Sequence, residues 1–252
     1  MAMAAENRDP VALVTGAARR IGAAVASQLH EAGFRLVLHC HHSVDDALAL
    51  CASMNSRRPG SAHVLIADLR KMEDITRLAA DALALWGRMD ALVNNASSFY
   101  PTPVGNIDER DWNDLIDTNL KSPLFLSQAL TPALRRHKGC IVNMADVHAE
   151  RPLAQHAVYC AAKAGNVMLT RSLAKDLAPD IRVNGIAPGA ILWPQSEAQL
   201  SEERKQTIIG KIALARAGNP SDIARTVRFL VVDAPYITGQ IIAVDGGRTL
   251  LS

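Results

Sequence analysis

The sequence predicts an α/β fold in which a doubly wound parallel sheet, flanked by helices, forms a single domain. Short runs of β-branched and apolar residues alternate with helical segments along the chain, which is typical of parallel strands joined by helical crossovers. The first of these runs enters a glycine-containing turn that opens a helix. The chain has 252 residues, of which 49% are hydrophobic, so one domain can bury a substantial core.

Composition and charge exclude several classes of protein. The net charge of +2 comes from 27 basic and 25 acidic residues without a block of one sign, so we expect no nucleic-acid partner and no membrane surface. The four cysteines lack C-x-x-C spacing, which indicates a reducing compartment and no metal site. Residues 1–10 lack the apolar stretch of a signal peptide, and no apolar run is long enough to span a bilayer. We expect a cytoplasmic protein with a flexible N-terminus over residues 1–10 and one domain over residues 11–252.

The first predicted strand and the turn after it indicate a nucleotide site. The strand Val11 to Val14 enters the turn Thr15 to Gly22, and a helical pattern then runs to Ala32, where Gly33 ends it. In Rossmann-like folds, backbone N–H groups of such a turn and the helix N-terminus hold a pyrophosphate. A plain tight turn is the alternative, but an arginine inside the turn favours an anion. The turn residues expected to bind the cofactor are Gly16, Arg20, Ile21 and Gly22.

The second predicted strand, Arg35 to His39, ends in a loop of hydrogen-bond donors. In this fold, a carboxylate near the end of the second strand bonds the adenosine ribose and repels an added phosphate. Neither Asp nor Glu occurs in this strand or loop. The sequence therefore predicts a pocket for a 2′-phosphate, so NADPH is favoured over NADH. The donors expected there are Arg20, His41, His42 and Ser43, although loop histidines are more often simply exposed.

The next elements are predicted to extend the sheet. Helices are expected over Val44 to Asn55 and Lys71 to Trp86, and strands over Ala62 to Ala67 and Asp90 to Val93. Asp68 and Leu69 follow the third strand, at the edge where a ligand would bind. The Asp68 carboxylate can bond the adenine amino group or, alternatively, cap the following helix.

An acid, a phenol and an amine are predicted to meet in the second half of the chain. Residues 108–138 read as two helices, and the strand Cys140 to Met144 leads to Asp146. Tyr159 and Lys163 lie one turn apart on a helix over Ala157 to Leu177, so they face the same way. We expect Tyr159 to donate a proton, with its pKa lowered by the Lys163 ammonium. Asp146 must then be paired with a cation or partly protonated. The alternative is that Tyr159 and Lys163 lie on a solvated face.

The C-terminal third is predicted to close the site. A strand over Ile181 to Ile186 opens on a Pro-Gly turn whose amides can bond a nicotinamide carboxamide. The polar segment from Gln195 to Gly218, within a region spanning residues 191–218, is expected to form a lid over the substrate. A helix over Asp222 to Val232 and a strand over Ile241 to Val244 follow. The residues assigned to the cofactor here are Pro188, Gly189 and Ile191, and Trp193 is assigned to the substrate.

These motifs resemble the short-chain dehydrogenase/reductase family from about Val11 to Gly247. The glycine turn is similar to its T-G-x-x-x-G-x-G motif, with Arg20 at the middle glycine. The resemblance implies that Asn119 connects a water chain to Lys163 and acts in catalysis. It also implies that Asn95, Ala96 and Ser97 contact the cofactor, and that Ser97 and Phe99 lie where a substrate would meet the nicotinamide.

Asp146 departs from that family pattern, in which a serine stands thirteen positions before the tyrosine. An ionised carboxylate would repel a developing alkoxide, so ordinary ketone reduction is disfavoured. Together with Arg20, the loop after the second strand and the NNASSFYPTP segment, Asp146 looks like the pteridine reductase subfamily of bacterial type. That resemblance implies NADPH-dependent reduction of pterins or folates to tetrahydro forms, such as tetrahydrobiopterin. A pterin would lie between Phe99 and the nicotinamide while Asp146 and Tyr159 relay a proton.

Relatives in this family are usually tetramers, so a homotetramer is expected. Two other functions are carried as alternatives. The first is a carbonyl reductase acting on 3-oxoacyl thioesters, which would share Tyr159 and Lys163. The second is an NADPH-binding sensor without turnover, which would bind NADPH tightly but oxidise it with neither pterin nor ketone.

Overall fold

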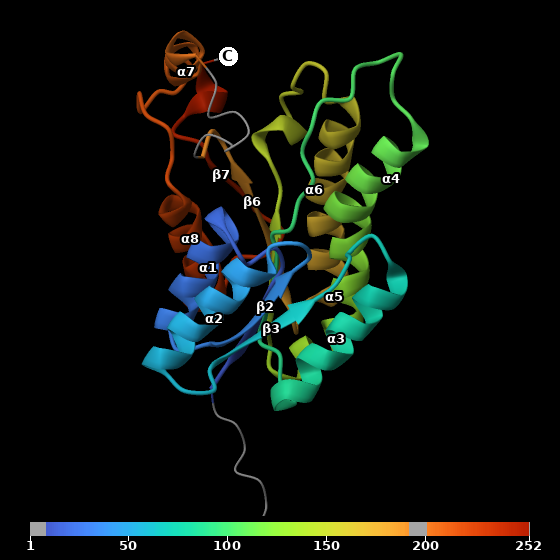
Figure 1. The fold of residues 1–252 in the computed structure, drawn as a ribbon, viewed down its shortest axis with the longest axis vertical. Coiled ribbons are helices and arrows are strands. Elements are labelled where there is room, and N and C mark those ends of the chain that lie inside the picture. Colours follow the sequence, from blue (N-terminus) through green and yellow to red (C-terminus); the bar gives the residue numbers. More distant parts are fainter. Residues whose placement is uncertain (1–8, 192–200, 252) are drawn as a thin grey trace, which may run out of the picture.

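The computed structural model describes residues 9–191 and 201–251 and confirms the predicted α/β class. Seven parallel strands form one sheet in the order β3-β2-β1-β4-β5-β6-β7 (Figure 1). The strands are β1 Val11–Val14, β2 Arg35–Cys40, β3 Ala62–Ile66, β4 Ala91–Asn94, β5 Cys140–Met144, β6 Arg182–Pro188 and β7 Ile241–Val244. The helices are α1 Arg20–Glu31, α2 Val44–Arg57, α3 Met72–Trp86, α4 Glu109–Ile116, α5 Ser122–Arg136, α6 Ala157–Leu177, α7 Glu202–Ile209 and α8 Pro220–Arg228.

Helices cover both faces of the sheet. In Figure 1, α1, α2 and α8 lie on one side of the sheet, and α3, α5 and α6 lie on the other. Strand β1 packs side chains against both faces of the sheet, because successive side chains of a strand point in opposite directions. Ala12 and Val14 pack in the cluster with α1 and α8, whereas Val11 and Leu13 pack in the cluster with α3 and α5. Burial on both sides explains why β1 is a continuous apolar run.

The strand order reverses beside β1. The chain passes from β1 to β2 and β3 in one direction, and β4 then pairs with the opposite side of β1. In doubly wound sheets, ligands bind in the crevice outside the carboxyl ends of the strands at such a reversal. This topology places the glycine turn after β1 next to the segments that follow β4 and β5.

Two π-helical turns make the observed helices differ from the predicted ones. Helices α4 and α5 were expected as separate elements with Asn119 between them, but a π-helical turn, Asp117–Lys121, joins them. A second π-helical turn, Phe229–Asp233, replaces the predicted end of the last long helix. Trp193 and residues 195–200 of the predicted lid lie outside the described residues. Among the helices that the structure describes, none is both long and apolar enough to cross a membrane.

Candidate active site

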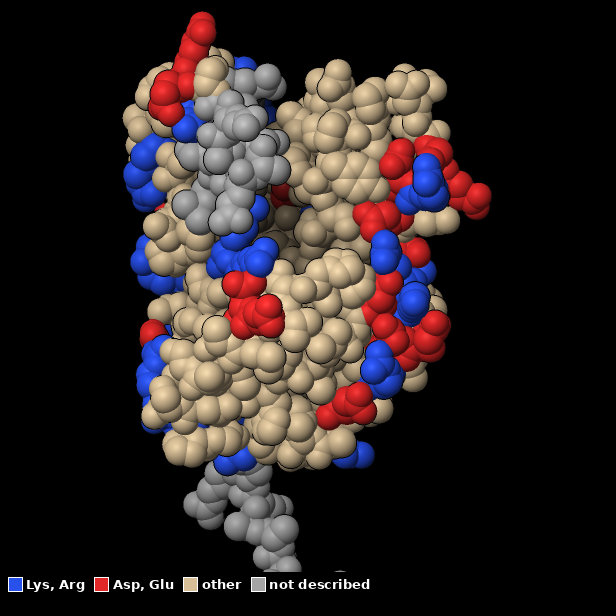
Figure 2. Space-filling view, in the orientation of Figure 1, with Lys and Arg blue, Asp and Glu red and all other residues tan. Residues whose placement is uncertain are grey.

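A cavity of about 1030 Å³ lies at the carboxyl edge of the sheet. Its size is at the upper end of the range of about 300–1000 Å³ typical of ligand pockets. Figure 2 shows the surface hollowed between the part that carries α7 and the part that carries α4 and α6. Most of the predicted site residues line this cavity: Gly16, Arg20, Ile21, Gly22, His41, His42, Asp68, Leu69, Asn95, Ala96, Ser97, Phe99, Asp146, Tyr159, Lys163, Pro188, Gly189 and Ile191. Ser43 and Asn119 are not among the lining residues.

The glycine turn is packed so closely that two positions require glycine. Gly16 has φ +61°, a conformation that side chains disfavour. A Cβ on Gly22 would lie 2.0 Å from the Gly16 carbonyl oxygen, so the start of α1 rests directly on the turn. Arg19 precedes α1 without a capping bond from its side chain, and the first helical turn has no acidic residue. The helix N-terminus therefore presents its N–H groups and positive dipole end to the cavity, as anion binding requires.

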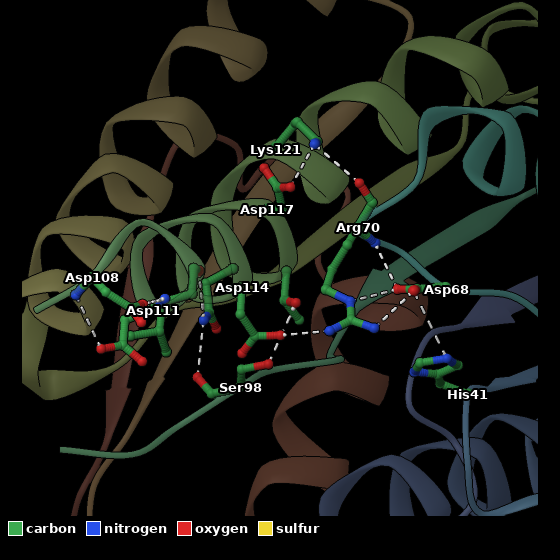
Figure 3. A network of polar contacts seen from close by, with 12 residues as sticks. His41, Asp68, Arg70, Ser98, Asp108, Asp111, Asp114, Asp117 and Lys121 are labelled. Carbon is green, nitrogen blue, oxygen red and sulfur yellow. Dashed lines mark hydrogen bonds and ion pairs between the residues drawn. The ribbon is translucent and has the colours of Figure 1, made fainter. Parts of the chain in front are cut away.

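The Asp68 carboxylate, which follows strand β3, lies close to the predicted phosphate pocket. His41 and His42 lie with ring centroids 3.6 Å apart, and the His41 Nε2 atom is 4.0 Å from the Asp68 Oδ2 atom. Sequence reasoning considered only the loop after β2 and missed this approach. Arg70 neutralises Asp68 through two hydrogen bonds of 2.8 Å, from Nε to Oδ1 and from Nη2 to Oδ2 (Figure 3).

The Arg70 contacts engage both oxygens of the Asp68 carboxylate. The Arg70 guanidinium holds the pKa of Asp68 well below its usual range, so the carboxylate stays charged. Lys71, and not Asp68, is the residue flanking α3, and its side chain makes no capping bond, whereas the Asp68 Oδ1 atom accepts from the Arg70 backbone N–H at 3.1 Å one residue earlier. Arg70 also donates to Asp114 of α4 at 3.3 Å, and Lys121 donates to the Arg70 carbonyl at 3.0 Å (Figure 3). This network joins the end of β3 to α4 and the π-helical turn.

The Tyr159 hydroxyl donates a hydrogen bond of 2.7 Å to the Asp146 Oδ2 atom. The other carboxylate oxygen, Oδ1, accepts from the His148 backbone N–H at 2.8 Å, because Asp146 caps the short 3₁₀ helix Val147–Ala149. Two donors therefore fix the orientation of the carboxylate. The structure thus satisfies the Asp146 carboxylate by hydrogen bonds to a phenol and a backbone amide.

The pKa of Tyr159 is shifted in the direction opposite to the prediction. Burial and the neighbouring Asp146 raise the pKa of the phenol well above its usual value. Lys163 does not offset them, because its ammonium donates to the Met144 carbonyl at 2.8 Å and lies 5.7 Å from the Tyr159 ring centroid. Burial also lowers the pKa of Lys163 to about 8. Tyr159 therefore holds its proton throughout the neutral range.

Phe99 forms an aromatic wall beside the acid and phenol pair. The residue is 43% exposed, and its ring is T-shaped to that of Tyr159, with centroids 4.8 Å apart and planes at 77°. His156, which the sequence did not single out, stacks on Phe99 with centroids 4.8 Å apart and planes at 17°. The cavity thus has a flat aromatic surface next to the Tyr159 side chain.

Comparisons with known proteins agree with the fold. Residues 16–249 match a family described as enoyl-(acyl carrier protein) reductase. The 3-oxoacyl-(acyl-carrier-protein) reductase FabG of Staphylococcus aureus is 38% identical over 239 residues, which cover 94% of this chain and 96% of the relative. Pteridine reductase 1 of Leishmania tarentolae is 37% identical over 284 residues, with 96% of each chain covered. The chain belongs to the short-chain dehydrogenase/reductase family. It is therefore an oxidoreductase, and the two relatives differ in the substrate that their names state.

Asn119 supports the site of this reductase from behind the cavity wall. Its side-chain oxygen accepts from the Ser97 hydroxyl at 2.7 Å, and its amide donates to the Ser98 and Leu115 carbonyls at 2.9 Å each. Asn166 of α6 donates to the Asn119 backbone carbonyl at 3.0 Å. The π-helical turn that contains Asn119 is thus tied to α6 and to the loop after β4.

The Pro-Gly turn of the reductase offers fewer backbone donors than expected. Pro188 has no N–H, and the Gly189 N–H donates to the Val244 carbonyl at 3.0 Å. The turn amides that can serve a carboxamide are therefore those of Ala190 and Ile191. A Cβ on Gly189 would lie 2.7 Å from the Asp245 Cα atom, so the turn packs against the end of β7.

Proposed function

We propose that this reductase is an NADPH-dependent pteridine reductase that converts dihydropterins or pterins, and dihydrofolate, to tetrahydro forms. One observation carries the proposal: the Tyr159 hydroxyl is hydrogen-bonded at 2.7 Å to a carboxylate on the cavity wall. Ketone reduction builds negative charge on the substrate oxygen, which Asp146 would repel. Reduction of a ring C=N bond instead requires that a nitrogen gain a proton, which this pair can provide.

The residues at the glycine turn and the strand ends fit NADPH. The N-terminus of α1 would hold the pyrophosphate, while Arg20, His41 and His42 would face the 2′-phosphate. The neutralisation of Asp68 by Arg70 removes the charge that would otherwise repel this phosphate. When bound, the cofactor supplies a hydride.

The substrate is held by shape and stacking. A flat heterocycle would lie parallel to the exposed face of Phe99, since offset aromatic stacks are favoured. Ser97, fixed by its bond to Asn119, would contact the polar edge of the ring. An acyl chain would gain less from this wall, because it has no flat face to stack.

Tyr159 and Asp146 act together as the proton source. The raised pKa of Tyr159 keeps the phenol protonated at neutral pH. As the carbon of the C=N bond accepts hydride, the adjacent nitrogen takes a proton from this pair, and the pair regains a proton from solvent at the cavity mouth. Lys163 is buried beside this pair, and its ammonium would hold the cofactor ribose.

Reduction of a 3-oxoacyl thioester is the second candidate, because the FabG relative is as similar to this chain as the pteridine reductase. The test is to follow NADPH absorbance with dihydrobiopterin, dihydrofolate and a 3-oxoacyl thioester in parallel. We expect oxidation of NADPH with the first two substrates. Turnover of the thioester alone would overturn the proposal in favour of the second candidate.

The proposal includes a homotetramer. Helix α6 exposes the small side chains of Ala157, Ala161 and Ala164 together with Met168, which is 61% exposed. Gly165 does not belong to this exposed set, because a Cβ there would lie 2.9 Å from Leu120 of the same chain. Light scattering of the purified protein measures the mass directly, and a monomeric mass would contradict this part.

A further inference from the structure

His39 lies in the wall of the cofactor cavity and has no role in the proposed chemistry. It belongs to β2 and is only 2% exposed. Its Nδ1 atom accepts from the Gly16 backbone N–H at 3.2 Å, and its Nε2 atom lies 3.1 Å from the Ala67 carbonyl oxygen. An N–H group can only donate and a carbonyl can only accept, so the ring is neutral with its hydrogen on Nε2.

These two contacts link segments that serve different parts of a nucleotide. Gly16 opens the turn that faces the pyrophosphate, and the Ala17 N–H also donates to the His39 carbonyl at 2.9 Å. Ala67 directly precedes Asp68, whose carboxylate begins the network with Arg70 at the adenosine end (Figure 3). The imidazole therefore spans the gap between the glycine turn and the end of β3.

We propose that His39 is a positioning residue that fixes the glycine turn relative to the end of β3 and so keeps the NADPH site open in its binding geometry. The proposal rests on the NADPH-binding part of the proposed function and is independent of the substrate. The Gly16 N–H is committed to the imidazole, so its orientation is set before any ligand arrives. A ligand then does not have to order the turn, and affinity increases when ordering is done in advance.

The charge of the ring is consistent with this role. Burial lowers the pKa of His39 to about 4, and His41 acts in the same direction. The imidazole therefore stays neutral in ordinary assay buffers, and Nδ1 keeps the lone pair that accepts from Gly16. A protonated ring would place two donors face to face at this contact.

Substitutions can separate the two hydrogen bonds. The side-chain oxygen of His39→Asn is placed close to the former Nδ1 and can accept from Gly16, whereas His39→Gln extends its amide towards Ala67. His39→Ala removes both contacts. His63→Asn is the matched control, because His63 is an exposed histidine on the neighbouring strand β3, edge-on to Trp86 and not in the cavity wall.

The measurement is NADPH affinity by fluorescence titration, with thermal unfolding of the free proteins recorded in parallel. We expect His39→Ala to weaken NADPH binding about tenfold, and His39→Asn to restore most of the loss. We also expect kcat at saturating NADPH to stay within about twofold in each folded variant, because a positioning role acts on binding.

Two results would overturn the role of His39. One is wild-type NADPH affinity in His39→Ala. The other is equal affinity in His39→Asn and His39→Gln, and this comparison stands even when His39→Ala does not fold. Absence of NADPH binding by the wild-type protein would instead refute the proposed function, so the two failures are distinguishable.

Discussion

Replacement of Asp146 by asparagine tests the proposed proton source most directly. The amide oxygen of asparagine must accept from the His148 N–H, since that group can only donate. The amide NH₂ group then faces Tyr159, whose hydroxyl loses the acceptor that it has at 2.7 Å in the wild-type protein. The substitution therefore keeps the cap of the short helix and removes only the carboxylate of the pair.

The structure sets the size of the expected effect. A positioned general acid contributes about 10²- to 10⁴-fold to rate, so we expect kcat with dihydrobiopterin to fall by that range in Asp146→Asn. This corresponds to about 3–5 kcal/mol of transition-state stabilisation. The pKa of Tyr159 should fall towards its usual value but stay above it, because burial, its largest cause, remains. The Kd of NADPH should change less than about twofold, since the Asp146 carboxylate bonds Tyr159 and His148 and not the glycine turn.

Stopped-flow NADPH oxidation gives the rate, and fluorescence titration gives the Kd. The matched control is Asp180→Asn, which removes a surface carboxylate paired with Arg135 at 3.1 Å and should leave both values unchanged. Asp146→Ser is the reciprocal variant, and we expect it to lose pterin turnover and to gain activity on a 3-oxoacyl thioester. Pterin turnover that is unchanged in Asp146→Asn would remove the carboxylate from the mechanism.

Three further predictions concern the walls of the cavity. Phe99→Leu should raise the KM for dihydrobiopterin about 2- to 10-fold, because an aromatic contact contributes about 0.5–1.5 kcal/mol. The affinity for NADPH should not change. A KM for dihydrobiopterin equal to that of the wild-type protein would exclude stacking on Phe99. Burial lowers the pKa of Lys163 to about 8, so its ammonium is present below that pH and lost above it. A pH profile of kcat/KM for NADPH should therefore decline above about pH 8, and a plateau to pH 10 would refute the role of the ammonium. Arg70→Gln leaves Asp68 without its guanidinium and should weaken NADPH binding about tenfold by fluorescence titration, whereas wild-type affinity would show that the pair is unrelated to the cofactor.

The order of elements could be predicted because it depends on local patterns. Apolar runs, glycines at helix ends and the spacing of Tyr159 and Lys163 are properties of neighbouring residues, and helix α6 has the predicted bounds, Ala157–Leu177. The same spacing gave the correct face for both side chains, which are 4% and 2% exposed. The π-helical turn that joins the two helices around Asn119 had no such signal, since such turns are rare and occur as single-turn bulges inside α-helices.

Contacts between distant segments could not be predicted from spacing. The neutralisation of Asp68 by Arg70 depends on how the chain turns after β3, and the stack of His156 on Phe99 joins two separate loops. The pKa of Tyr159 was predicted in the wrong direction because the sequence reveals neighbours along a helix but not burial. The Lys163 ammonium lies 5.7 Å from the Tyr159 ring centroid, and a positive charge there would lower the pKa of the phenol. Desolvation raises this pKa, and here desolvation is the larger effect.

The two hydrogen bonds of the Asp146 carboxylate allow its role in the fold to be separated from its role in the chemistry. One carboxylate oxygen closes the first turn of the 3₁₀ helix after β5, and the other meets the phenol of α6. Losing a cap costs about 0.5–2 kcal/mol, so Asp146→Ala should be less stable than wild type, whereas Asp146→Asn should unfold near the wild-type temperature. If proton transfer is the function of the carboxylate, both variants lose turnover despite this difference in stability. A variant series in which turnover instead follows the unfolding temperature would assign Asp146 to the fold alone.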